Sequence, residues 1–139
     1  MKEIFLLQGN YDYSALPSGK GTLTGRICVA EDGRFEGPIR DHQSRTPDQS
    51  LRGVLTTENN LDTLSFIKFP PSENLANLFY VLHKPHRGSW EGTYEGSWRV
   101  LPVKVEFAKD RGVFICTIDR MLAQYDIGDS ASIKVSRTS

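Results

Sequence analysis

The clearest architectural signal in the chain is the segment Gly88-Ser89-Trp90-Glu91-Gly92-Thr93-Tyr94-Glu95-Gly96-Ser97-Trp98-Arg99-Val100. Successive side chains of a β-strand point to opposite faces. One face of this segment therefore alternates glycine with large apolar residues, and the other carries Ser, Thr, Glu and Arg. Alternating large and small inward residues fill the tapering interior of a small β-barrel. The segment predicts a strand whose glycine and aromatic face turns inward.

The same five-residue pattern, Gly-x-(large apolar)-x-Gly, occurs four times, beginning at residues 21, 33, 88 and 92. The last two copies fuse into the segment above. A straight strand over 88–100 would be about 43 Å long at ~3.3 Å per residue, roughly twice the usual length. The segment is therefore expected to bend, and its glycines are where it can do so.

The remaining sequence reads as a series of short strands with short connections. Strands are expected over 3–13, 21–30, 34–40, 51–57, 61–69, 77–84, 103–108 and 113–119, with a last strand that turns Ala131, Ile133 and Val135 inward. A polar loop is expected over 41–50, a turn over 72–76 and one helical turn after Asp119. A helix over 72–84 is the alternative to the turn and strand there, because apolar residues also recur at helical spacing.

These eight to ten strands predict an all-β, antiparallel up-and-down meander that closes into a barrel, as a single domain over 1–139. A β-sandwich remains open, since closure depends on register. The length of 139 residues fits one domain with its own core.

The charge balance bears on partners. Seventeen basic and 17 acidic residues give a net charge of zero. A general nucleic-acid binder needs a basic surplus, so no nucleic-acid partner is expected. Zero net charge favours self-association, so a homo-oligomer is compatible with the composition.

The two cysteines, Cys28 and Cys116, are expected to be buried and reduced. The apolar run at the N-terminus, Ile4 to Leu7, is shorter than the roughly 7–15 residues of a signal peptide. No segment approaches the ~20 apolar residues of a membrane span. A cytoplasmic protein without a membrane partner is expected.

Two local motifs resemble known families. Gly9-Asn10-Tyr11 resembles the Gly-x-Trp that opens lipocalin and avidin barrels, with Tyr in place of Trp. This calycin-like resemblance implies an up-and-down barrel with a small apolar ligand in its mouth, and it carries over no ligand-binding residue. The segment 94–98 is similar to the centre of a MORN repeat, but the glycine motifs do not recur at the constant step that such arrays require.

The aromatic residues Trp90, Tyr94 and Trp98 are the leading site candidates, as core filler or as the wall of a ligand pocket. Indole N–H and phenol O–H groups can anchor a ligand that such a wall holds. Tyr80 and Arg26 complete the predicted ligand-binding set, as ionisable groups that an inward register would place beside the aromatics.

Other polar residues are interpreted as solvated. Glu91 and Glu95 would lie about 13 Å apart on the outer face, too far for an acid–base pair. His83, His86 and His42 lack a third metal ligand of recognisable spacing, and neither cysteine has a nucleophile context. No metal and no cofactor is expected. Arginines around the polar loop, at 40, 45 and 52, could instead form an anion anchor at a barrel rim.

The sequence thus predicts a barrel that binds a small, partly apolar molecule. One alternative is a small barrel enzyme of isomerase, cyclase or hydrolase type, which would use Tyr80, Arg26 or His83. The other is a module that self-associates through an exposed strand edge or aromatic patch.

Overall fold

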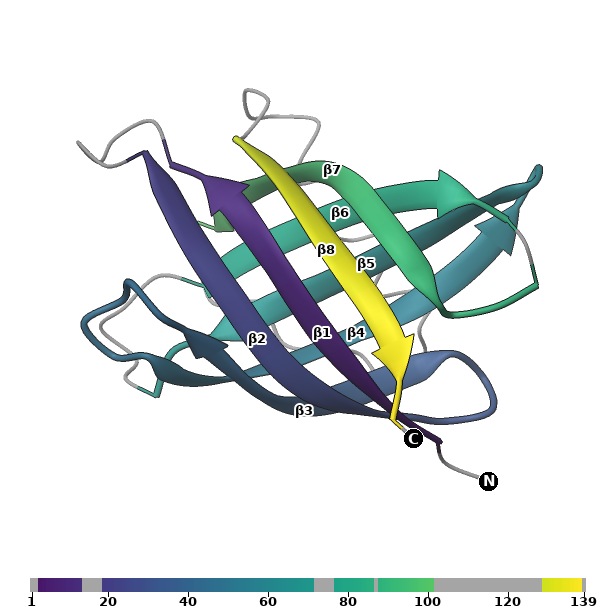
Figure 1. The fold of residues 1–139 in the computed structure, drawn as a ribbon, viewed down its shortest axis with the longest axis horizontal. Coiled ribbons are helices and arrows are strands. Elements are labelled where there is room, and N and C mark those ends of the chain that lie inside the picture. The colour runs from purple at the N-terminus through teal and green to yellow at the C-terminus, as the bar shows by residue number, and fades with distance from the viewer. Residues whose placement is uncertain (1–2, 14–18, 72–76, 87, 102–128, 139) are drawn as a thin grey trace.

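The structure, a computed structural model, describes residues 3–13, 19–71, 77–86, 88–101 and 129–138. Eight antiparallel strands form one closed barrel in the order of the chain (Figure 1). The strands are β1 (Glu3–Asp12), β2 (Lys20–Val29), β3 (Arg34–Asp41), β4 (Asp48–Glu58), β5 (Leu61–Phe69), β6 (Asn77–Pro85), β7 (Gly92–Leu101) and β8 (Ser130–Arg137).

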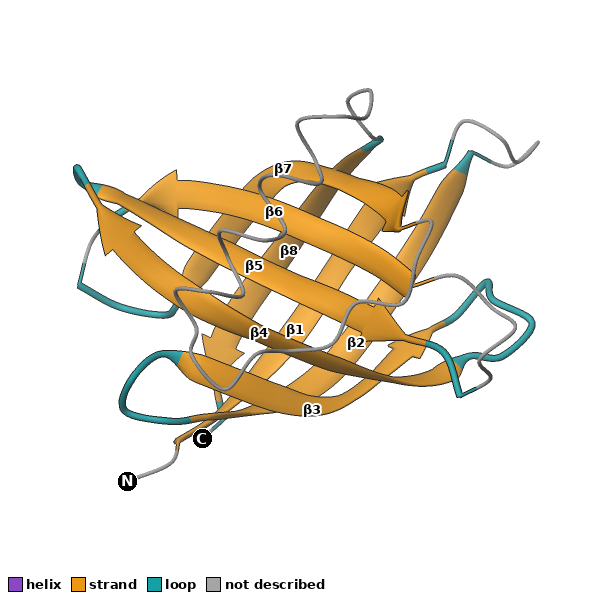
Figure 2. Cartoon of the chain, turned by 180° about the vertical axis from the view of Figure 1, so that it is seen from behind, coloured by secondary structure: helices purple, strands orange, loops and turns teal. Residues whose placement is uncertain are grey.

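Each strand pairs with its neighbours in sequence, and β1 pairs with β8 to close the ring. In that closing ladder Phe5 lies opposite Arg137 and Tyr11 lies opposite Ala131. β4, β5 and β6 form the wall opposite β1, β2 and β8 (Figure 1 and Figure 2). The predicted all-β meander and its closure are confirmed, and the sandwich alternative is wrong.

Two segments differ from the predicted strand limits. β4 begins at Asp48 and β3 extends to Asp41, so the connection between them is shorter than the predicted loop 41–50. The strand predicted over 77–84 is confirmed as β6, which excludes a helix there. The elements predicted over 72–76, 103–108 and 113–119, the helical turn after Asp119, and Cys116 lie outside the described residues.

The sequence predicts one continuous strand over 88–100. This is wrong, because β7 begins only at Gly92. Residues 88–90 form a bend instead. Gly88 and Gly92 have φ values of +72° and +133°, backbone conformations that favour glycine. The bend lies at glycine, as predicted, but it comes before the strand rather than within it. Val100, predicted to face inward, is 48% exposed near the other end of β7.

The glycines inside the strands mark close approach of neighbouring backbones. A Cβ atom added to Gly96 would lie 2.0 Å from the carbonyl oxygen of Val81 in β6. A Cβ on Gly37 would lie 2.1 Å from the carbonyl oxygen of Arg26 in β2. These positions admit only hydrogen as a side chain, and this lets the strands coil tightly around the interior.

The interior is apolar at its centre and charged at both ends. On β5 the inward residues run Asp62, Leu64, Phe66 and Lys68, and all four are buried. We call the end that holds the turn at Asn59 and Asn60 and the bend at 88–90 the terminal end, because Glu3 and Arg137 also lie there (Figure 1). The opposite end, where β3 and β5 finish, is the distal end.

Candidate functional site

The predicted ligand-binding residues divide between the two ends of the barrel. Trp90 and Tyr94 belong to the terminal end, where the Tyr94 hydroxyl donates a hydrogen bond to the backbone oxygen of Trp90 at 3.2 Å. Tyr80 and Trp98 lie together toward the distal end, with ring centroids 6.2 Å apart. Tyr80, Tyr94 and Trp98 are buried and Trp90 is half-buried.

Arg26 does not join either group. Its neighbours Gly25 and Ile27 face the interior, so alternation turns Arg26 to the outer surface, where it is exposed. His83 is also exposed, between the inward residues Leu82 and Lys84, and its Nδ1 lies 3.0 Å from the Thr63 hydroxyl. Of the three residues considered for an enzyme, Tyr80 alone points inward.

At the terminal end, Trp90 packs against the interior rings from a bend outside the strands. Its ring centroid lies 5.7 Å from that of Phe5 and 5.5 Å from that of Phe35, which it meets at right angles. Edge-to-face contacts of this kind add to the stabilisation from burial. Trp90 therefore covers the terminal end of the core without belonging to a strand.

Two pockets flank Trp90, and both are lined by Gly88, Ser89 and Trp90. The larger, of about 440 Å³, is completed by Glu3, Phe5, Val29, Ala30, Glu31 and Arg137. The smaller, of about 200 Å³, is completed by Leu55, Thr57, Asp62 and His86. Trp90 thus stands at a mouth with apolar walls and charged groups on both sides.

Asp62 organises the polar side of the smaller pocket. Its Oδ1 accepts hydrogen bonds from the Thr57 hydroxyl and from His86 Nδ1, each at 2.7 Å, and its Oδ2 accepts one from Lys84 Nζ at 2.8 Å. Lys84 Nζ also lies 5.2 Å from the centre of the Tyr94 ring. Every donor in this cluster is directed at one buried carboxylate, which is the condition under which a buried charge is tolerated.

The pKa of Asp62 reflects this arrangement. Burial alone would raise it, but the hydrogen bonds from Lys84, Thr57 and His86 outweigh burial and hold the pKa below the ordinary value of 3.8. Asp62 is therefore a carboxylate at neutral pH. Because a carboxylate accepts only, the short His86 contact places a proton on Nδ1, and in a neutral ring Nε2 is then the atom that can accept from a ligand.

A second buried ion pair closes the distal end. Lys68 donates to Asp41 Oδ2, and the Tyr11 hydroxyl donates to Asp41 Oδ1 at 2.8 Å. Lys68 Nζ lies 5.2 Å from the centre of the Tyr11 ring and 5.8 Å from that of Tyr80. The Tyr80 hydroxyl, buried in the same region, has no hydrogen-bond partner among the described residues. Unlike the Asp62 cluster, this cluster contains a buried donor without an acceptor.

Aromatic rings surround the distal cluster. Tyr80 stacks on Phe66 with centroids 4.7 Å apart, and Trp98 contacts both Tyr11 and Tyr13 at 5.4 and 5.2 Å. Trp98 Nε1 donates to the backbone oxygen of Asp12 at 2.9 Å. This low-polarity setting lowers the pKa of Lys68 by burial, which outweighs the opposing attraction of Asp41.

The buried phenols predict loss of stability in alkali. Burial raises the pKa of Tyr11, Tyr80 and Tyr94 above the ordinary value of 10.0. The carboxylate of Asp41 adds to this shift at Tyr11 and Tyr80, and that of Asp62 does so at Tyr94. Above pH 10 the unfolded chain releases phenolic protons that the barrel retains, so the free energy of unfolding falls as pH rises. The pKa of Lys68 is lowered in the folded state, so this residue makes the free energy of unfolding rise with pH below pH 10.5. Its single contribution is smaller than that of three phenols.

An alkaline titration followed by phenolate absorbance and far-ultraviolet circular dichroism measures this. At least three of the five tyrosines are expected to ionise only as the dichroism is lost. Denatured protein, the control, is expected to ionise all five near the ordinary pKa. Ionisation of all five while the dichroism stays native would contradict the buried placement.

The four charged residues of these clusters are absent from the predicted site. Asp62 and Lys68 share the spacing of Leu64 and Phe66, and Lys84 shares that of Tyr80 and Leu82. Alternation along the strands was therefore a usable signal for three of them. Asp41 falls in the predicted polar loop 41–50, and spacing alone does not identify it as the last residue of β3.

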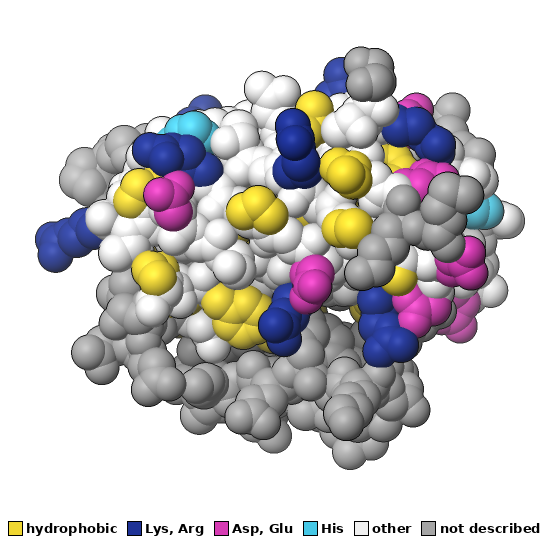
Figure 3. Space-filling view, turned by 90° about the horizontal axis from the view of Figure 1, so that it is seen from below, with side chains coloured by type: hydrophobic (Ala, Val, Ile, Leu, Met, Phe, Trp, Pro, Cys, Tyr) yellow, Lys and Arg dark blue, Asp and Glu magenta, His cyan; other side chains and the backbone are white. Residues whose placement is uncertain are grey.

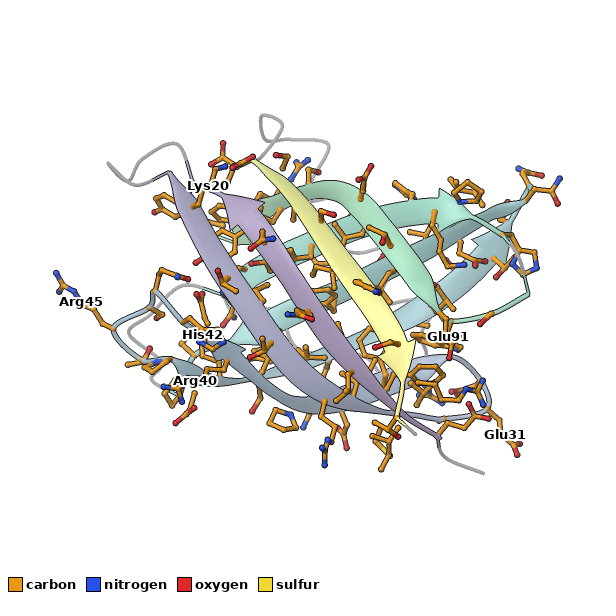
Figure 4. The ribbon with its side chains drawn as sticks, in the orientation of Figure 1. Lys20, Glu31, Arg40, His42, Arg45 and Glu91 are labelled. Carbon is orange, nitrogen blue, oxygen red and sulfur yellow. The ribbon has the colours of Figure 1, made fainter. Side chains whose placement is uncertain are left out.

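The polar residues that were interpreted as solvated are mainly exposed. Glu91 and Glu95 are both exposed, and His42 lies 2.7 Å from the Thr24 hydroxyl on the outer surface. Lys20, Arg40, His42 and Arg45 lie toward the distal end and Glu31 and Glu91 lie at the terminal end (Figure 4). Figure 3 shows acidic side chains gathered at the terminal end, on the right. Cys28 is a free, half-buried cysteine rather than a fully buried one.

Among the described residues, no three His, Cys, Asp or Glu side chains gather as a metal site would require. The same part of the chain contains no helix with the length and apolar character needed to cross a bilayer. Comparison with models of protein families, with curated proteins and with solved structures finds no match to this chain. The calycin relationship stays a prediction beyond the shared outline of an antiparallel barrel.

Proposed function

We propose that this protein binds a small, partly apolar ligand at the terminal end, beside Trp90. The observation that carries the proposal is the position of this half-buried indole between pockets of about 440 and 200 Å³. Small-molecule sites typically measure roughly 300–1,000 Å³ and combine apolar walls with a few polar groups. Phe5, Val29 and Trp90 supply apolar walls of the larger pocket, and Leu55 and Trp90 supply those of the smaller one.

Two polar groups at this mouth would orient the ligand. His86 is 37% exposed, and its Nδ1 is held by Asp62. Its Nε2 would accept a hydrogen bond from a hydroxyl or amine of the ligand. The second group is the guanidinium of Arg137, on the other side of Trp90. It lies 3.3 Å from a carboxylate oxygen of Glu3 and 3.6 Å from one of Glu91.

The backbone conformation around Trp90 suits residues 88–91 to be the part of the site that moves when a ligand enters. Gly88 and Gly92, with their positive φ values, bracket the indole, and neither belongs to the interior of a strand. A ligand could exchange with Trp90 by a change confined to 88–91, without breaking the barrel ladders. Loops on rigid scaffolds often carry binding residues for this reason.

The proposal is tested in two ways. Native mass spectrometry of protein purified from its source is expected to show a small bound molecule. In vitro, anilinonaphthalene sulfonate serves as a flat apolar probe, and the variant Trp98→Phe leaves Trp90 as the only tryptophan of the two in the chain. Saturable binding of the probe is expected to quench Trp90 fluorescence.

Matched variants locate the site. Trp90→Ala is expected to weaken probe binding about tenfold, or ~1.4 kcal/mol, as measured by the fluorescence of the probe itself. Arg26→Ala, which removes an exposed side chain on the outer wall, is expected to leave binding unchanged. Equal affinity in Trp90→Ala and the parent protein, with no co-purified molecule, would overturn the proposal.

The self-association alternative loses one of its two routes in a closed barrel. Each of the eight described strands pairs on both sides, so an open sheet edge is not offered by them. Exposed apolar side chains on β1, Ile4 and Leu6, remain as a route for contact. Light scattering at high protein concentration tests that alternative, and a strict monomer would remove it.

A further inference from the structure

We propose that Lys68 at the distal end is a reactive amine that forms an imine with an aldehyde or ketone, with Tyr80 as the hydrogen-bond donor to the carbonyl oxygen. This site is separate from the mouth at Trp90. The proposal rests on the polar groups of the distal cluster and does not depend on ligand binding at the terminal end.

The contrast between the two buried lysines is the first argument. Lys84 belongs to a cluster in which Asp62 accepts from three side chains and holds His86 as well as the ammonium. Among the described residues, Lys68 donates a hydrogen bond to Asp41 alone. Its Nζ also lies close to the rings of Tyr11 and Tyr80. In the described part of the chain, the Thr57, His86 and Lys84 donors all reach Asp62, whereas the Tyr80 hydroxyl in the region of Lys68 reaches no acceptor.

The hydroxyl of Tyr80 is the second argument. Tyr80 is fully buried, yet its hydroxyl lacks a partner among the described residues. A buried donor without an acceptor costs about 1–3 kcal/mol, and such groups in native structures call for an explanation. A carbonyl oxygen is an acceptor of the required kind, and the Tyr80 ring lies beside Lys68 Nζ.

The surroundings suit nucleophilic chemistry of an amine. Lysine reacts as the neutral amine, which burial favours. In the cluster the proton passes from Lys68 Nζ to Asp41 Oδ2 along their hydrogen bond. Asp41 Oδ1 meanwhile keeps the hydrogen bond from Tyr11, so the proton acceptor stays in place.

The reaction then balances without an oxidant or cofactor. The Lys68 nitrogen attacks the carbonyl carbon, and one of the two protons on that nitrogen passes to the carbonyl oxygen to give a carbinolamine. Loss of the nitrogen proton and of the hydroxyl, as water, leaves the C=N bond of the imine. Tyr80 donates a hydrogen bond to the departing oxygen, and Asp41 returns to the imine nitrogen the proton that it took from the ammonium.

Aromatic contacts indicate the class of carbonyl compound. Phe66 and Trp98 stack on Tyr80, and Trp98 also stacks on Tyr13, so a ligand next to Lys68 would meet aromatic rings, which suit a flat apolar body beside the carbonyl. A carbonyl compound would have to enter from the distal end, where Asp41 is the last residue of β3 and Lys68 lies one residue from the end of β5, and it would have to displace side chains that leave Lys68 only 1% exposed. The expected ligands are aryl or conjugated aldehydes.

Reductive trapping tests the assignment. The protein is incubated at neutral pH with cinnamaldehyde and cyanoborohydride, which converts an imine into a stable secondary amine. Peptide mapping by mass spectrometry then measures the label on each lysine. Label on Lys68 is expected to exceed that on Lys84 roughly tenfold, because the two are similarly buried but differ in their partners.

Variants separate chemistry from folding. Lys68→Arg keeps the positive charge beside Asp41 but cannot form an imine, and it is expected to lose the label with native circular dichroism. Tyr80→Phe is expected to slow labelling several-fold without moving it, and Lys84→Met is expected to leave the Lys68 label in place. Label confined to surface lysines, or an equal amount on Lys68 and Lys84 in the parent protein, would overturn the proposal.

Discussion

Replacing Asp62 with Asn is expected to lower the free energy of unfolding by about 3–5 kcal/mol, the cost of breaking a buried ion pair from one side. The variant keeps the shape of the side chain but leaves Lys84 as a buried cation without its counter-charge. It also places an amide N–H₂ where Thr57, His86 and Lys84 all donate. Denaturant unfolding followed by circular dichroism measures the change.

An exposed ion pair on the same barrel supplies the control. Asp48 pairs with Arg40 at 3.0 Å, with both side chains largely in solvent. Asp48→Asn is expected to cost less than about 1 kcal/mol, because solvent screens such pairs. The double variant Asp62→Leu with Lys84→Met removes both buried charges, and it is expected to recover part of the loss. Equal costs for Asp62→Asn and Asp48→Asn would contradict the buried network.

The same residue sets the acid behaviour of the parent protein. The folded pKa of Asp62 is lowered, so its contribution to stability is complete above the unfolded value of 3.8 and disappears as pH falls through the lower folded value. The free energy of unfolding should therefore decline below about pH 4 in the parent. In Asp62→Asn that part of the acid dependence is expected to be missing.

The second large effect is expected at Gly96, where Ala should destabilise the barrel by about 3 kcal/mol, near the upper end for overpacking. The added methyl would stand 2.0 Å from the carbonyl oxygen of Val81 and 2.9 Å from the Cα of Leu82. Both are backbone atoms of β6, which cannot move without disturbing their own ladder. Thermal or denaturant unfolding gives the value.

Gly25→Ala provides a graded comparison. Its methyl would meet the carbonyl oxygen of Pro38 at 2.9 Å, a milder contact, and Ala also restricts the unfolded chain in favour of folding. The loss at Gly25 is therefore expected to be clearly smaller than at Gly96. If Gly96→Ala were as stable as the parent, the close approach of β6 and β7 could not be a fixed feature of the barrel.

The architecture was largely predictable because alternation is a strong signal wherever one face is buried. Ala131, Ile133 and Val135 were predicted to face inward and do so. The prediction that the strand starts at Gly88 is wrong for a local reason. The alternating pattern of the sequence continues through this glycine, whereas its backbone adopts a left-handed conformation. Closure by β1 and β8 depends on register, which the pattern of either strand alone does not specify.

The site was predictable only in its aromatic part. Tyr80, Tyr94 and Trp98 are large apolar groups whose burial follows from the hydrophobic effect. Lys68 and Lys84 were overlooked because a lysine is rarely buried unless it is paired, and the pairing joins residues on different strands. Arg26 shares its face with Thr24 and Cys28 rather than with Leu23 and Ile27, so its outward position was present in the pattern.

The unbroken ring of eight strands has a consequence for how the molecule unfolds. In an open sheet a terminal strand can detach by breaking one ladder, and such a strand frays independently of the rest. Here β1 and β8 are hydrogen-bonded to each other as well as to β2 and β7, so the departure of any strand breaks two ladders at once. The barrel should therefore lose its structure as one cooperative unit. A substitution at either end, at Asp62 or at Asp41, is then expected to lower the stability of all eight strands together.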